Sequence, residues 1–125
     1  MVISDKPLLF AEKVGLKLPN GYVDAKALGL VNLTPWHFLS DEEFDYLFSG
    51  LGTRYPHHKA IPYARRSDND DVACFVRAES SGTLCEVVII HDFASLGYEV
   101  VVNFDTFWEW FQHAVAEMVQ WHEAS

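Results

Sequence analysis

The sequence has few basic residues, few cysteines and no long apolar run. Its 125 residues include nine Lys and Arg against 18 Asp and Glu, and the formal net charge is -9. Such a surface repels phosphate backbones and anionic headgroups, so nucleic acid and membrane surfaces are poor candidates as partners. No apolar stretch approaches the ~20 residues that a membrane-spanning helix needs. The first residues also lack the cationic start and apolar run of a secretory signal, so we expect a cytoplasmic protein.

The only cysteines are Cys74 and Cys85, which are too few for a cysteine-based zinc site. They fall on neighbouring predicted strands, where they lie either directly opposite each other or diagonally. Only the first arrangement suits a disulfide. Because we expect a cytoplasmic chain, we predict that both are buried thiols.

The composition is typical of one folded domain. Hydrophobic residues make up 50% of the chain and charged residues 22%, and a chain of this size buries roughly two-thirds of its unfolded surface. The predicted elements are helices, then strands, then a helix. This order predicts a single α+β domain over residues 1–125, with an antiparallel sheet of about four to six strands and with N-terminal and C-terminal helices packed against it.

Three helices are predicted in the first half of the chain. Short ones are expected within residues 6–19 and 20–30, the second stopping at Gly29. A third follows Ser40, which forms an S-x-x-E capping box with Glu43. Its apolar residues have helical spacing, and we expect its two glycines to end it. The apolar residues are Phe44, Leu47, Phe48 and Leu51, and the glycines are Gly50 and Gly52.

The pattern changes from helical to extended after Pro56. Residues 60–66, 71–78 and 84–93 are short runs rich in β-branched or aromatic residues, as strands are. Residues 80–82 are a turn signal, so the second and third runs are predicted to form a hairpin. Residues 98–102, after a turn at Gly97, predict a fourth strand. The short connections favour antiparallel pairing.

The chain closes with its longest predicted helix, from Phe104 to about His122, with Asn103 as the N-cap. Trp110 and Trp121 lie together on the flank of its apolar stripe. They either widen the stripe that packs into the core or form an aromatic patch for a partner. The stripe that we expect to be buried comprises Phe104, Phe107, Trp108, Phe111, Val115 and Met118.

The segment from Arg65 to Asp71 concentrates opposite charges between two predicted strands. Asp68-Asn69-Asp70-Asp71 suggests a calcium loop at first, but an apolar residue stands where the third ligand belongs and no glycine follows. Asp and Asn also bond their own backbone in turns. We therefore predict a charged turn, with Arg65, Arg66 and the aspartates structural or facing a partner, and no metal.

The histidines offer a weak catalytic pattern. His57 and His58 are adjacent, so they diverge in either a strand or a helix, and His91 and Asp92 diverge in an extended chain. Zinc spacings, a G-x-S-x-G elbow and a phosphate-binding glycine loop are absent. A metal-assisted hydrolase that uses His57, His91 and the aspartate turn is the competing hypothesis. We predict no catalytic residues, no metal and no cofactor.

Four motifs occur in a familiar order. These are Leu-Pro-Asn-Gly-Tyr at 18–22, Ile-Pro-Tyr-Ala at 61–64, the aspartate turn at 68–71, and the aromatic run at 103–111. Together they resemble the SUKH superfamily, the Smi/Knr-type cell-wall regulator domain. Asn69-Asp70 departs from the glycine that is common in the family's turn, but both residues tolerate the left-handed conformation.

The resemblance implies a non-catalytic binding protein. Similar members are mostly bacterial immunity proteins that neutralise toxins, often nucleases, and fungal relatives are regulatory scaffolds. An acidic immunity protein facing a basic toxin domain would account for the net charge. A regulatory or scaffold module that binds a cellular protein is the alternative, and the oligomeric state stays open. The expected partner-binding residues are Arg65, Arg66, Asp68, Asp70, Asp71, Trp110 and Trp121.

Overall fold

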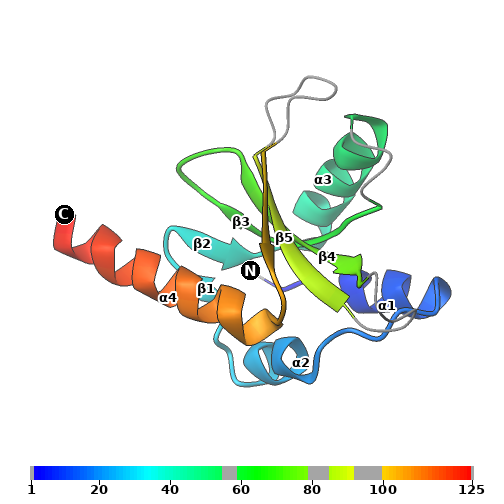
Figure 1. Ribbon diagram of the computed structural model, residues 1–125, viewed down its shortest axis with the longest axis horizontal. Coiled ribbons are helices and arrows are strands. Elements are labelled where there is room, and N and C mark those ends of the chain that lie inside the picture. Colours follow the sequence, from blue (N-terminus) through cyan, green and yellow to red (C-terminus); the bar gives the residue numbers. More distant parts are fainter. Residues whose placement is uncertain (1, 55–58, 79–84, 92–99, 125) are drawn as a thin grey trace.

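The computed structural model describes residues 2–54, 59–78, 85–91 and 100–124, and this part of the chain has an α+β fold (Figure 1). The helices are α1 (Lys6–Lys13), α2 (Asn20–Ala27), α3 (Asp41–Arg54) and α4 (Phe107–Ala124). The strands are β1 (Asn32–Leu33), β2 (Trp36–Phe38), β3 (Ile61–Arg66), β4 (Asp71–Arg77), β5 (Cys85–His91) and β6 (Val100–Phe104). The predicted fold class is confirmed.

The six strands form one antiparallel sheet in which spatial order follows sequence order, β1 to β6. The predicted pairing of β4 with β5 is confirmed, although its turn at 80–82 and the turn at Gly97 lie outside the described residues. No pattern in the sequence predicted β1 and β2. Both are too short to show an alternating pattern, and they are joined through Thr34 and a cis Pro35.

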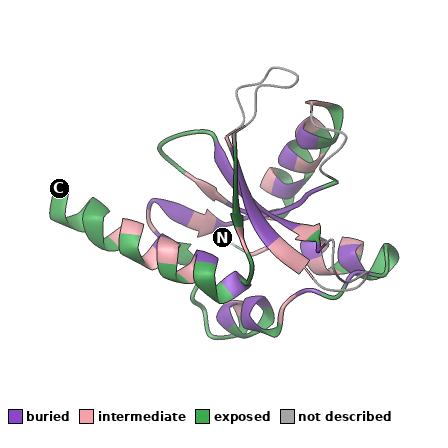
Figure 2. Ribbon diagram, in the orientation of Figure 1, coloured by how far each residue is buried: buried purple, intermediate pink, exposed green. Residues whose placement is uncertain are grey.

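Helices pack on both sides of this sheet (Figure 1). Helices α1 and α3 contact each other and β3, whereas α2 contacts α4, which in turn contacts β1, β5 and β6. Figure 2 shows that burial is concentrated in the strands and in the helix faces that meet them. Within the described residues, no helix combines the length and the apolar character that crossing a bilayer requires.

The aromatic side chains that fix the α2–α4 side of the core come from all over the sequence. Tyr22 lies at the centre, with its ring 5.1 Å from that of Phe75 and 6.0 Å from that of Phe107. Tyr63 stacks on Phe75 at 4.1 Å. All four residues belong to the motifs or strands from which the family resemblance was drawn, so these motifs are parts of the core.

Helix α3 begins as predicted but ends later. The amide of Glu43 donates to Ser40 Oγ at 3.3 Å, and the amide of Ser40 donates to Glu43 Oε1 at 3.1 Å, which confirms the capping box. The expected end at the glycines was wrong, because the helix runs through both of them to Arg54. A glycine inside a helix costs about 1 kcal/mol, and burial of the apolar face offsets that cost.

Helix α4 begins later than predicted. Phe104 and Asn103 belong to β6, where they pair with Val87 and Val88 of β5. The chain leaves the strand only after this pairing ends, and the helix starts at Phe107. Thr106, rather than Asn103, is its N-cap, since Thr106 Oγ1 accepts a hydrogen bond from the amide of Glu109 at 3.2 Å.

The buried face of α4 is also rotated from the predicted one. Trp110 is completely buried, whereas Trp108, which we expected in the core, is 45% exposed. The face that meets the sheet is Phe107, Trp110 and Ala114, and the small Ala114 allows the helix to approach closely. Since apolar residues cover more than half of the helix circumference, their spacing alone left the rotation undetermined.

Trp108 packs instead over the start of α2. A Cβ atom added to Gly21 would lie 2.8 Å from both Cε2 and Nε1 of the Trp108 indole. Gly21 is therefore the residue that lets the indole rest on the α2 backbone. The glycine of the Leu-Pro-Asn-Gly-Tyr motif is therefore explained by its packing against Trp108.

Both cysteines are free thiols. In the β4–β5 register Cys74 is opposite Val88 and Cys85 is opposite Arg77, so neither faces the other. Cys74 is fully buried, as predicted, but Cys85 is only half-buried and its Sγ contacts the Lys17 carbonyl oxygen at 3.2 Å. Burial raises the pKa of the Cys85 thiol to about 11.

Candidate functional site

The turn at 68–71, the first candidate for a partner-binding site, satisfies most of its charges internally. Arg66 donates from Nε and Nη2 to the two carboxylate oxygens of Asp68, each at 2.8 Å. This bidentate hydrogen bond from Arg66 lowers the pKa of the Asp68 carboxyl. The amide of Asp71 donates to Asn69 Oδ1 at 2.9 Å, which is an Asx turn. The prediction of a charged turn is confirmed.

Arg66 also connects the turn to α4 through Glu117. The Glu117 carboxylate accepts from Arg66 Nη1 and, at 2.9 Å, from the Trp36 indole nitrogen, and it lies 2.6 Å from His113 Nε2. The carboxylate side chain is 21% exposed, and that of Arg66 is 16% exposed. Sequence reasoning missed this network because its members are 51 and 81 residues apart, with no shared motif.

Asp71 points into the structure rather than toward a partner. It is 9% exposed and is hydrogen-bonded through Oδ1 to Nδ1 of His91, its cross-strand partner in the β4–β5 register. We had expected His91 and its sequence neighbour Asp92 to diverge, and Asp92 lies outside the described residues. The pairing of Asp71 with His91 is set by the register of β4 against β5, which no local sequence pattern predicts.

Arg65 lies on a second small charged cluster, beside the start of α3. Its Nη1 is 3.8 Å from Glu43 Oε2, and His37 Nε2 is 2.8 Å from the same oxygen. Burial acts to raise the pKa of Glu43, but hydrogen bonds from His37 and from Ser40 outweigh it, so the pKa is lowered overall. Arg65 therefore lies within ion-pairing distance of a partly buried carboxylate in the first turn of α3.

The two flank tryptophans have different environments. Trp110 is fully buried, with its ring 5.5 Å from that of Trp36 and 5.1 Å from that of Tyr63. The core alternative is thus confirmed for Trp110, and its place among partner-facing residues is corrected. Trp121 is 39% exposed near the end of α4.

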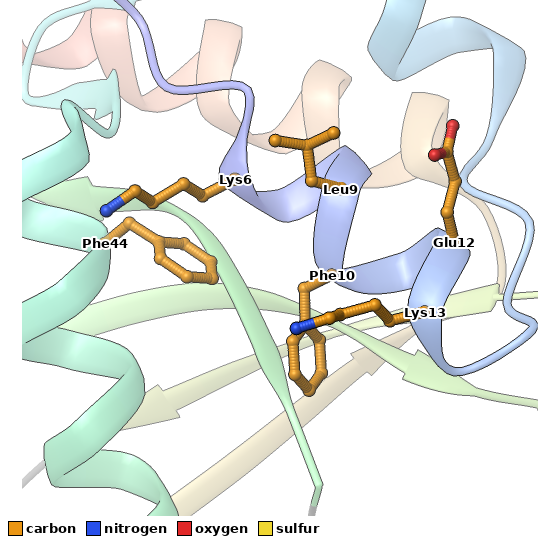
Figure 3. Close-up of a pocket in the computed structure, with 6 residues that line it drawn as sticks. All are labelled: Lys6, Leu9, Phe10, Glu12, Lys13 and Phe44. Atoms are coloured by element: carbon orange, nitrogen blue, oxygen red, sulfur yellow. The ribbon is translucent and has the colours of Figure 1, made fainter.

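An open groove of about 660 Å³ lies between α1 and α3. Leu9 and the rings of Phe10 and Phe44 line it, with lysine side chains at its rim (Figure 3). Lys6 is already paired, since its Nζ is 2.7 Å from Asp45 Oδ2. This lining offers apolar contact but few polar groups that could recognise a specific ligand.

His57 and His58 lie outside the described residues. In the ranges that the structure describes, no three His, Cys, Asp or Glu side chains are grouped so that they could hold a metal ion. Comparison with protein-family models, curated proteins and solved structures found no match for this chain.

The net charge is distributed unevenly along the chain, which the total of -9 does not reveal. Residues 1–77 contain ten acids and nine Lys and Arg, a net charge of -1. Residues 78–125 contain eight acids and no Lys or Arg, a net charge of -8. Among the described acids of this second part, Asp105, Glu109 and Glu123 are exposed.

Proposed function

We propose that this chain is a non-catalytic, protein-binding domain of the cytoplasm that neutralises a basic bacterial toxin domain, as an immunity protein does. The proposal follows the resemblance to the SUKH superfamily and needs only a stable fold with a free acidic surface. A toxin domain with nuclease activity would be basic, because enzymes that bind nucleic acid carry positive surfaces.

The observation that carries the proposal is the contrast between paired and unpaired charge. The clusters around Arg66, Asp71 and Glu43 hold strands and helices together. Of the described acids in residues 78–125, Glu117 belongs to one of these clusters, whereas Asp105, Glu109 and Glu123 are exposed. A potential of one sign speeds association with a partner of the opposite sign and makes the rate salt-sensitive.

The test begins with the reading frame that adjoins the gene for this chain. Its product is expressed alone and together with this protein, and growth of the host is followed. We expect the neighbouring product to be toxic alone and harmless in co-expression, and we expect a complex of the purified proteins whose association rate falls as salt increases.

A toxic neighbour that is neither rescued nor bound would refute the immunity function. A harmless neighbour that still binds would favour the regulatory or scaffold function instead. Hydrolytic turnover by this protein alone, lost on His91→Ala, would support the competing hydrolase hypothesis.

A further inference from the structure

The last turns of α4 have an apolar side that is partly exposed. Phe107, Trp110 and Ala114 are buried on the side that meets the sheet. Trp121 continues the same side, eleven residues or about three turns after Trp110. Figures 1 and 2 show why it is exposed: the end of α4 projects past the sheet, and burial decreases along the helix.

Other apolar side chains adjoin Trp121 on this projecting end. Val119 is 48% exposed, and Val115 and Met118 are partly buried at the margin of the core. The four residues fall within two turns, so their side chains form a continuous apolar strip, which we name the α4 strip: Val115, Met118, Val119 and Trp121. Tryptophan is over-represented among the residues that dominate binding energy at protein interfaces.

Two exposed acids lie on the same helix as the α4 strip, together with His113 and His122. Glu123 is exposed next to Val119 on the helix surface, and Glu109 is exposed in the first turn of the helix, almost two turns before Val115. Helix α4 contains no Lys or Arg, and Arg77 is the last Arg in the chain. An apolar centre with an acidic margin is complementary to a partner surface with an apolar centre and Lys or Arg around it.

We propose that the α4 strip is the surface that binds the basic partner protein, with the exposed Trp121 and Val119 at its two edges and the partly buried Val115 and Met118 between them. This inference rests on the proposed function and names the surface that performs it. It moves the interface away from the 68–71 turn, where Asp68 is held by Arg66 and Asp71 is buried.

A second copy of this chain is a poorer occupant. Two strips in contact would bring Glu123 of each copy close to the other, within a part of the chain that carries a net charge of -8. Like charges facing each other across an interface oppose association. A basic partner converts the same charges into attraction.

Two matched pairs of variants test the inference. Trp121→Ser and Glu123→Gln alter the strip and its margin. Tyr46→Ser and Glu42→Gln are the controls, since Tyr46 is 74% exposed on α3 and Glu42 is an exposed acid on that helix. Circular dichroism melting verifies that each variant is folded, and calorimetry measures binding to the product of the adjoining reading frame.

We expect Trp121→Ser to weaken binding about tenfold or more, and Glu123→Gln to weaken it about two- to fivefold and reduce its salt dependence. Both controls should bind within about twofold of the unaltered protein. Equal binding by the strip variants and the unaltered protein would overturn the assignment of the surface while leaving the proposed function intact.

If the unaltered protein does not bind that product, the proposed function fails, and the strip is tested with a synthetic amphipathic helix of leucine and lysine. Binding that is lost in Trp121→Ser but kept in Tyr46→Ser supports the α4 strip. Loss of binding in both variants or in neither overturns it. A dimer in sedimentation equilibrium that is lost in Trp121→Ser would also overturn it, because the strip would then bind a second copy.

Discussion

Trp110 and Trp121 lie on the same side of α4, yet the first is fully buried and the second is 39% exposed. Helix geometry places both side chains on one side of α4, because they are separated by about three full turns. The difference comes from what lies opposite: Tyr63 of β3 and Trp36 of β2 pack against Trp110, whereas the C-terminal end of α4 projects past the sheet (Figure 1). One apolar face thus contributes to the core at its start and is partly exposed at its end.

The largest expected effect is at Trp110. Trp110→Ala should reduce the free energy of unfolding by about 3–5 kcal/mol, because it opens a cavity among packed aromatic rings. Urea unfolding followed by circular dichroism measures the change. A loss below about 1 kcal/mol would mean that Trp110 is not a core residue and would remove the contrast with Trp121.

Trp110 also shows how far the sequence could predict this fold. The capping box, the strands after Pro56 and the long final helix were visible because each is a local pattern. The rotation of α4 was not, since FWEWF is apolar on several sides and only contact with β2 and β3 selects one. We had expected Trp108 to be buried in the core instead, and it is 45% exposed.

The candidate site was less predictable than the fold, again for physical reasons. Arg66 and Asp68 are two residues apart, so their pairing follows from local chemistry. Glu117 joins them only because α4 crosses the sheet, and Asp71 meets His91 only because of strand register. When an acid is buried by elements that are distant in the sequence, no local sequence pattern predicts its burial.

The next effect concerns Glu117, which lies between the buried and projecting parts of α4. Glu117→Gln keeps an oxygen for the Trp36 indole but removes the charge that pairs with Arg66. We expect a loss of about 1.5–3 kcal/mol, the range for hydrogen bonds to charged groups. Glu123→Gln, on the exposed end, is the control and should change unfolding by less than about 0.5 kcal/mol. Equal effects at both positions would show that the Glu117 network does not anchor α4.

A smaller loss is expected for Trp108, whose indole is half-covered by Gly21 and by Phe111 at a ring distance of 5.3 Å. Trp108→Ala should cost about 1–3 kcal/mol, because only part of its apolar surface is removed from water. The same urea titration, run beside Trp110→Ala, ranks the two. A loss at Trp108 that exceeds the loss at Trp110 would restore the rotation of α4 that we first predicted.

The smallest effect on stability is expected at Trp121, and it is the one that separates packing from binding. Trp121 is 39% exposed, and no aromatic ring of the described residues contacts it. Trp121→Ala should therefore change the free energy of unfolding by less than about 1 kcal/mol, as at an ordinary surface position. The same variant should weaken binding to a basic partner, whereas Trp110→Ala, measured where it is still folded, should change binding little. If Trp121→Ala destabilises the protein as much as Trp110→Ala does, the end of α4 is part of the core, and its apolar residues are explained by packing alone.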